Sequence, residues 1–179
     1  KHLKRDEEIG VGVIGRVYKL LSNDKTYAFK ELNVKKINDK NIDAFIKSNE
    51  KLKIDQHPNI AIMHSILMNK NKPGILFEYC EKNLEDIIQS EKLSNEKTVF
   101  IIYQIAEGMR FAHSKKIIHR NLKPTNILFT EKTNEFTVKI TDFGTPDLLS
   151  IEEQLSSCIS ISQKFMAPEL FDEEKNYTE

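Results

Sequence analysis

The stretch from Ile117 to Leu128 constrains this chain more than any other. Two β-branched residues, Ile117 and Ile118, run into a polar cluster that begins at His119, and apolar residues resume after Asn126. This order predicts a short strand, a polar loop and a second short strand. Because the loop places charged and amide groups between two apolar segments, it is a candidate functional site.

A similar pattern follows a few residues later. The run from Val138 to Ile140 predicts a strand, and Asp142 lies directly beyond it in the sequence Asp-Phe-Gly. Asn126 and Asp142 thus carry an amide and a carboxylate at the edges of predicted strands. Oxygen atoms of these two types are ligands for hard cations such as Mg²⁺, and both side chains could reach one ion.

The two motifs resemble those of eukaryotic protein kinases. Residues 119–126 read His-Arg-Asn-Leu-Lys-Pro-Thr-Asn, and the catalytic loop of that family reads H-R-D-L-K-P-x-N. The resemblance covers nearly the whole chain and implies an α+β, two-lobed fold. It assigns residues 1–79 to a small lobe with an antiparallel sheet and a helix, and residues 80–179 to the first part of a mainly helical large lobe. Asn121 stands where the family has its catalytic aspartate.

A glycine-rich segment supports a nucleotide site. Gly10, Gly12 and Gly15 form a G-x-G-x-x-G pattern, whose spacing is shared with dinucleotide-binding folds. The β-type run from Val17 to Leu20 predicts a hairpin here instead of the helix that those folds require. Glycines without Cβ let backbone amides lie against phosphates. The alternative is a glycine-rich turn that binds no ligand.

The resemblance implies a full ATP and Mg²⁺ site. Lys30, on the predicted strand 26–32, would hold the α- and β-phosphates, although a strand lysine can also be merely solvated. Lys123 would contact the γ-phosphate, while Asn126 and Asp142 would bind Mg²⁺. The remaining residues implied for the nucleotide site, with Phe77 as gatekeeper and the backbone of Glu78 and Cys80 at the adenine edge, are Ile9, Gly10, Gly12, Gly15, Val17, Ala28, Phe77, Glu78, Cys80 and Leu128.

The predicted helix at residues 41–55 departs from the family. There a helix glutamate pairs with the strand lysine, and counting back from the His-Pro-Asn-Ile motif at 57–60 places Ser48 in that position. Glu50 lies roughly 200° farther around a helix, so it is expected to face elsewhere. A shifted helix would bring Glu50 back, and both possibilities remain open.

A longer helix is predicted beyond Ser94, its expected N-cap, and Asn83 is the expected N-cap of a shorter one. The expected buried face of the long helix comprises Val99, Ile102, Ile105, Ala106, Met109 and Ala112. The chain ends shortly after a Met-Ala-Pro-Glu motif at 166–169, before the helices with which the family continues. We therefore expect residues 1–179 alone to expose apolar surface and to be unstable or to aggregate.

Residues 144–166 map to the activation loop and contain several serines, Ser150, Ser156, Ser157, Ser160 and Ser162. One hypothesis is that phosphorylation of this loop is regulatory and that the added charge pairs with Arg120. A solvated, serine-rich loop without such a role is an equal alternative.

Composition excludes several classes of partner. Lys+Arg and Asp+Glu both number 27, so no net charge favours nucleic acid or an anionic membrane. The longest apolar run, residues 99–103, is far too short for membrane insertion. Two cysteines without a motif favour a reduced, cytoplasmic protein.

Function depends on Asn121, because an amide takes up no proton near neutral pH. General-base catalysis typically contributes about 10²–10⁴-fold in rate. Three readings remain open: an ATP-binding pseudokinase that acts as a signalling switch or scaffold, a serine/threonine kinase of low or unusual activity, or a degenerate fragment with neither role. The first implies a regulatory protein partner and the second a protein substrate.

Overall fold

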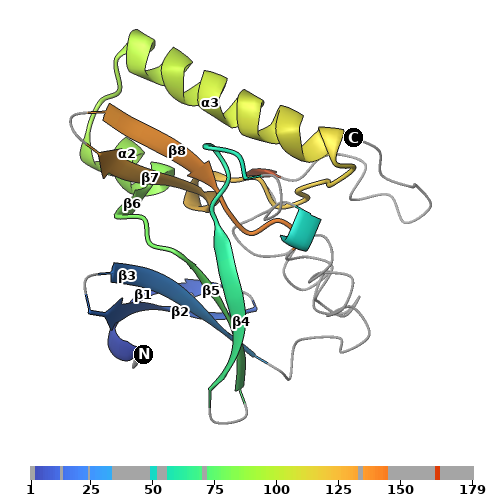
Figure 1. Cartoon of the computed structure of the whole chain (residues 1–179). Coiled ribbons are helices and arrows are strands. Elements are labelled where there is room, and N and C mark those ends of the chain that lie inside the picture. Colours follow the sequence, from blue (N-terminus) through green and yellow to red (C-terminus); the bar gives the residue numbers. More distant parts are fainter. Residues whose placement is uncertain are drawn as a thin grey trace.

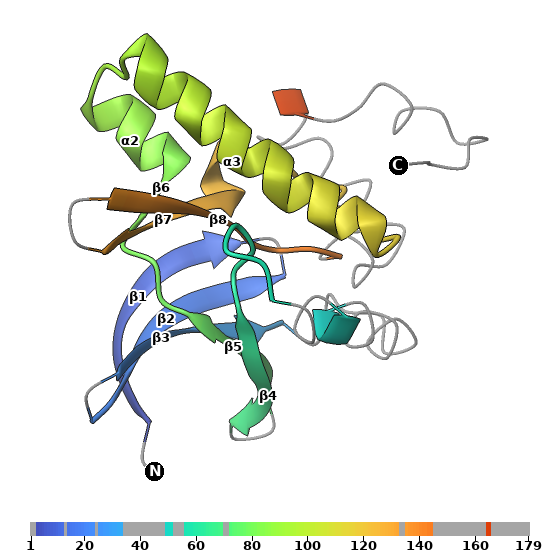
Figure 2. The same cartoon turned by 45° about the horizontal axis from the view of Figure 1, so that its top comes forward.

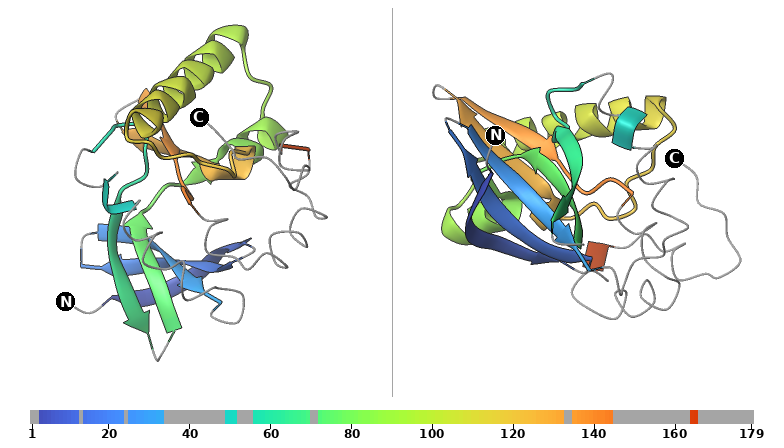
Figure 3. Two further views of the ribbon diagram at one scale, coloured as in Figure 1. Left: turned by 90° about the vertical axis from the view of Figure 1, so that its right-hand side faces the viewer. Right: turned by 60° about the horizontal axis from the view of Figure 1, so that its bottom comes forward.

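The computed structural model describes residues 3–12, 14–23, 25–33, 49–51, 56–69, 72–132, 135–144 and 164–165. A five-stranded antiparallel sheet forms one part, and a three-stranded sheet with two helices forms the other (Figure 1). The predicted α+β fold, with its antiparallel small-lobe sheet, is confirmed. The chain passes from the larger sheet to the smaller one through residues 79–81 (Figure 3).

The larger sheet has the strand order β1-β2-β3-β5-β4. Its strands are β1 (Lys4–Gly12), β2 (Gly15–Ser22), β3 (Lys25–Leu32), β4 (Met63–Asn69) and β5 (Lys72–Glu78). The glycine-rich segment forms the hairpin between β1 and β2, in which Gly12 lies opposite Gly15. The hairpin predicted from the sequence is therefore confirmed.

The smaller sheet has the order β6-β7-β8 and is covered by helices. Its strands are β6 (Lys82–Asn83), β7 (Ile127–Lys132) and β8 (Glu135–Ile140), with a 3₁₀ turn η1 (Pro124–Asn126) before β7. The helices are α2 (Leu84–Ser90) and α3 (Asn95–Ser114). Both predicted caps are present, because Asn83 accepts from the Asp86 amide and Ser94 accepts from the Lys97 amide.

The main core lies between α3 and the smaller sheet, on the side of that sheet that faces away from the larger one (Figure 2). Its fully or nearly fully buried residues are Ile60, Ile87, Ile101, Ala112, Ile117, Ile127, Phe129, Val138, Ile140 and Phe143. A buried polar group, Gln104, is part of the same interface. Its Oε1 accepts hydrogen bonds from Asn59 Nδ2 and from the Val138 amide, both at 2.9 Å.

The predicted buried face of α3 is partly wrong. Ala112 is buried and Ile105 and Met109 pack against the core, but Val99 and Ile102 are 66% and 59% exposed and Ala106 is exposed. The residues that α3 buries are Ile101, Gln104, Gly108 and Ala112. Three of these are not large apolar residues, so apolar periodicity alone does not reveal the face that packs.

Two predicted strand segments are also corrected. Ile117 and Ile118 are not in a strand, because this segment leaves α3 and enters the loop directly. The apolar run at residues 60–63 also predicts a strand, but β4 begins only at Met63. Ile60 makes only an isolated bridge to Ile140, which docks the segment before β4 onto the smaller sheet. Hydrogen bonds of the Ala61 amide to Ile140 O and of the Ile140 amide to Asn59 O complete this contact.

Some predictions fall outside the described residues. These are Ser48 and most of the helix at 41–55, of which residues 49–51 are described as helical. The serine-rich segment from 145 to 163 is likewise not described. No helix in the described part of the chain is long and apolar enough to span a membrane.

Candidate nucleotide site

The loop at residues 119–126 is held by its own backbone and amides. Asn126 Nδ2 donates to Asn121 O at 2.7 Å, and the Asn126 main-chain O accepts from the Thr141 amide at 3.0 Å. Arg120 adopts φ of +60°, which is an uncommon conformation for a residue with a side chain. Such a conformation persists only where the surroundings fix it, and it is often found at functional sites.

The buried side chain of His119 supports this loop. Its side chain is 1% exposed, and its ring lies 4.5 Å from the Phe143 ring between centroids. His119 Nδ1 accepts a hydrogen bond from the Asn121 amide at 3.2 Å. Burial lowers the pKa of His119 to about 4, although nearby Asp142 opposes the shift. A neutral histidine packed against Phe143 supports the loop.

The charged centre of the site is an ion pair between Lys30 and Asp142. Lys30 Nζ and Asp142 Oδ2 lie 2.7 Å apart, and their side chains are 6% and 18% exposed. Lys30 comes from the middle of β3, while Asp142 follows β8 and has φ of +69°. Two segments 112 residues apart in the chain therefore meet at one buried contact.

Lys123 is the third charged group at this centre. Burial lowers its pKa, Asp142 acts to raise it, Lys30 acts to lower it and Glu85 acts to raise it. These effects show that Lys123 lies within electrostatic reach of both members of the ion pair. The structure thus brings Lys30 into contact with Asp142, and the charges of both act on Lys123.

The glycines of the hairpin serve two different purposes. A Cβ on Gly15 would collide with the main-chain O of Glu31, so the close approach of β2 and β3 requires glycine there. A Cβ on Gly10 or Gly12 would meet only ordinary contacts, the nearest at 3.8 and 3.7 Å. Packing in the described residues does not explain why these two positions are glycine. An approaching ligand would explain it.

The other residues implied for the nucleotide lie mainly on the larger sheet, while Leu128 lies on the smaller one. Val17 lies opposite Lys30, and Ala28 lies opposite Phe77, so cross-strand pairing puts each pair on one face of the sheet. Ile9 is 40% exposed on β1, and Leu128 is half-buried on β7.

Glu78 ends β5 and Cys80 follows it, and the resemblance places the backbone of both at the adenine edge. The Glu78 amide donates to Ile62 O at 3.0 Å, so this donor is not available to an adenine. Burial raises the pKa of the Cys80 thiol to about 12, which keeps it protonated.

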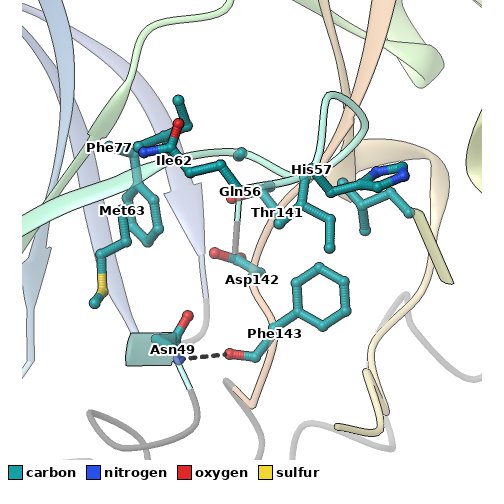
Figure 4. A pocket seen from close by; sticks show the side chains of 12 residues that line it. Asn49, Gln56, His57, Ile62, Met63, Phe77, Thr141, Asp142 and Phe143 are labelled. Carbon is teal, nitrogen blue, oxygen red and sulfur yellow. Dashed lines mark hydrogen bonds between the residues drawn. The ribbon is translucent and has the colours of Figure 1, made fainter. Parts of the chain in front are cut away.

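A pocket next to the ion pair reveals a residue that the sequence did not single out (Figure 4). Asn49, from the helical turn at 49–51, is 6% exposed and points toward the segment that begins at Asp142. Its Nδ2 donates to Phe143 O at 3.4 Å. Phe77 and Met63 line the same pocket. Glu50, the neighbouring acid, is exposed.

The fold and this arrangement agree with comparisons against known proteins. The family model described as "Protein kinase domain" matches residues 3–179. This chain belongs to the protein kinase family. The eukaryotic protein kinase resemblance is therefore confirmed.

Curated protein kinases are similar over most of this protein kinase domain. Serine/threonine-protein kinase atg1 of Dictyostelium discoideum is 32% identical over 97% of this chain and 27% of its own length. Serine/threonine-protein kinase pakH of the same organism is 34% identical over 93% of the chain and 32% of its own length. Cell division control protein 2 homolog 3 of Trypanosoma brucei brucei is 29% identical, over 97% and 56%. The chain thus spans from about a quarter to about half the length of these relatives.

Proposed function

We propose that this chain is the ATP-binding part of a pseudokinase, a cytoplasmic signalling switch or scaffold with a regulatory protein partner. The observation that carries the proposal is the contact between Lys30 and Asp142 next to a loop whose catalytic position is the neutral Asn121. The charges of both residues also act on Lys123 of that loop. Lys30 lies opposite Val17, on the strand that follows the glycine-rich hairpin, and its ammonium group suits a polyphosphate. The neutral amide removes the carboxylate that would accept the hydroxyl proton of a substrate.

The residues present fit Mg²⁺ in a limited way. Asn126 Oδ1 and the Asp142 carboxylate are oxygen donors of the type that Mg²⁺ accepts, and such sites complete their shell with phosphates and water. Asn126 Nδ2 is fixed on Asn121 O, which leaves its oxygen as the free end of the amide. When bound, the ion would neutralise phosphate charge. Asn126 would orient it, while Lys30 and Lys123 hold the phosphates.

A second candidate function is a serine/threonine kinase of low or unusual activity on a protein substrate. It is favoured by the presence of Lys123, Asn126 and Asp142 and by the similarity to proteins named as serine/threonine-protein kinases. Phosphoryl transfer depends mainly on positioning and charge neutralisation. Asn121 can still accept a hydrogen bond from a hydroxyl, so loss of the base lowers the rate without abolishing binding.

The test is γ-phosphate transfer from Mg²⁺-ATP to a generic serine/threonine substrate, with the full-length natural protein beside Asn121→Asp. The pseudokinase proposal predicts transfer by Asn121→Asp alone, with a gain of about 10²-fold or more. Comparable turnover by the natural protein would favour the kinase instead. If neither transfers phosphate, Asn121→Asp combined with Asn49→Glu tests whether the pairing of Lys30 is the further defect. A protein that binds no ATP would be a degenerate fragment.

A further inference from the structure

Asn49 is a polar side chain that is buried among apolar neighbours beside the ion pair. It is 6% exposed and lines the pocket together with Met63 and Phe77 (Figure 4). Burial of a carboxamide is unfavourable unless its polar atoms form hydrogen bonds. Asn49 Nδ2 donates to Phe143 O at 3.4 Å. The contact connects the helical turn that carries Asn49 with the residue that follows Asp142 in the chain.

The carbonyl that Asn49 binds belongs to the peptide group between Phe143 and Gly144. Asp142 and Gly144 both have positive φ, of +69° and +68°. Because glycine adopts many backbone conformations at little cost, this peptide group can turn unless a contact holds it. A positive φ at a residue with a side chain persists only where the surroundings fix it. The hydrogen bond from Asn49 is such a constraint, and it acts within two residues of the Asp142 carboxylate.

Two other contacts hold the same segment at other atoms. Lys30 Nζ binds the Asp142 carboxylate at 2.7 Å, and the His119 ring packs against the Phe143 ring with the centroids 4.5 Å apart. In the proposed nucleotide complex Lys30 holds phosphate, so it exchanges its contact with Asp142. The His119 contact acts on the ring of Phe143 and not on its carbonyl. The hydrogen bond from Asn49 then still holds the main chain while the carboxylate turns toward a metal ion.

We propose that Asn49 is a positioning residue that holds the Asp142 carboxylate in place for the metal ion of a bound nucleotide. This role rests on the proposed nucleotide-binding function and adds a residue from outside the sequence motifs to it. Asp142 is the metal ligand, and Asn49 acts on it through the main chain of Phe143. Hydrogen-bonding residues that orient a metal ligand typically contribute about 10–100-fold to metal affinity.

The experiment is a titration of the full-length protein with a fluorescent ATP analogue, in EDTA and in excess Mg²⁺ at equal ionic strength. The ratio of the two dissociation constants measures the contribution of the metal ion. Mg²⁺ is expected to tighten binding to the natural protein by about tenfold or more, and binding to Asn49→Leu by about threefold or less. In EDTA the two proteins should agree within about threefold. A merely structural role of Asn49 would instead weaken binding under both conditions.

Two further variants test whether the hydrogen bond is the cause. Lys51→Leu is the matched control, because Lys51 is exposed on the same helical turn, and it should keep the full gain from Mg²⁺. Asn49→Gln keeps a carboxamide donor and should keep more of the gain than Asn49→Leu. If melting curves show that Asn49→Leu is unfolded, Asn49→Ser takes its place with the same expected result, because its shorter side chain ends farther from Phe143 O.

The outcomes separate this role from the proposed function. A full gain from Mg²⁺ in Asn49→Leu, or an equal loss of affinity in EDTA and in Mg²⁺, would overturn the role of Asn49 and leave the proposed function intact. Equal binding to the natural protein with and without Mg²⁺ would do the same. Absence of binding to the natural protein under both conditions would overturn the proposed function, and the role of Asn49 with it.

Discussion

Glu78 Oε1 and Lys139 Nζ lie 3.0 Å apart and join the two sheets of the molecule. Glu78 is the last residue of β5 in the larger sheet, and Lys139 is in β8 of the smaller one. Glu78 Oε1 also accepts a hydrogen bond from the Ile62 amide at 2.8 Å. One carboxylate thus ties together β5, β8 and the segment before β4. Its side chain is 19% exposed and that of Lys139 is 12% exposed.

Removal of one partner of this pair is expected to destabilise the protein. Lys139→Met leaves the Glu78 carboxylate with only the Ile62 amide, and Glu78→Gln leaves the Lys139 ammonium without its counter-charge. Because both groups are mostly buried yet keep some contact with water, each change should lower the free energy of unfolding by about 1–3 kcal/mol. Denaturant unfolding of the full-length variants measures this.

The double variant Glu78→Gln/Lys139→Met separates the pair from other effects of the substitutions. Interacting residues give non-additive free energies, so the double variant should lose less stability than the sum of the two single variants. Strictly additive losses would mean that the two side chains contribute independently.

Gly108 is a second point of close contact between the parts of the molecule. A Cβ at this position of α3 would lie 2.8 Å from Ile140 Cδ1 and 2.9 Å from the main-chain Asn59 O. Helix propensity alone favours alanine over glycine by about 1 kcal/mol. Overpacking against a buried strand should outweigh that gain, so Gly108→Ala is expected to destabilise by about 1–3 kcal/mol.

The control for Gly108 lies on the exposed face of the same helix. Ala106→Gly meets no packed neighbour there and should cost about 1 kcal/mol through propensity alone. Both variants are compared with the natural protein by thermal and denaturant unfolding. A more stable Gly108→Ala protein would show that the interface relaxes around the added methyl group.

The sequence predicted the parts of the site that sit in short motifs. The hairpin of Gly12 and Gly15, Lys30 on its strand and Asp142 after β8 each depend on local spacing, which a single sequence displays directly. The convergence of Lys30 and Asp142 is a long-range contact. Its prediction came from the family resemblance and not from the pattern of the residues.

Two features of the structure could not be predicted from the sequence: the rotation of the helix that carries Asn49, and the face of α3 that packs. The rotation of the helix that carries Asn49 depends on what it packs against, and its partial apolar pattern of Phe45, Leu52 and Ile54 does not fix that rotation. For α3, apolar residues occur on opposite faces, so periodicity cannot tell which face packs. The face that packs is the one with Gln104, which accepts hydrogen bonds from Asn59 and Val138 that no sequence pattern predicts.

Stability should fall with acid in a window set by His119. Burial lowers its folded-state pKa from 6.5 to about 4, so the folded state favours the neutral ring. The contribution of neutral His119 to the free energy of unfolding is fully present above pH 6.5. It is lost as the pH falls toward about 4, because the unfolded state takes up the proton first. The full effect is on the order of 3 kcal/mol.

The measurement is the free energy of unfolding across that pH range, with His119→Gln as the comparison. The variant should be less stable near neutral pH and should show a shallower decline with acid. Burial also lowers the pKa of His57, which remains in both proteins, so its contribution cancels in the difference. Parallel pH profiles for the two proteins would show that His119 is not the source of the acid sensitivity.

The exposed face of α3 predicts how residues 1–179 behave in isolation. Val99, Ile102 and Tyr103 are 66%, 59% and 59% exposed, and Ala106 continues the same stripe at helical spacing. Large exposed apolar patches on a folded protein lead to association. We therefore expect the isolated chain to aggregate, and the double variant Val99→Glu/Ile102→Lys to reduce light scattering and the binding of a dye specific for apolar surface.

A substitution on the buried face of α3 provides the control for the variants of its exposed face. Because Val99 and Ile102 are mostly in solvent, their substitution should change the free energy of unfolding by no more than about 0.5 kcal/mol. Ile101→Lys, at a position that is 2% exposed, should instead unfold the chain, since it buries an unpaired charge in the core. A sharp, cooperative melt and a monomeric state of unmodified residues 1–179 would contradict the prediction and would mean that this face tolerates water.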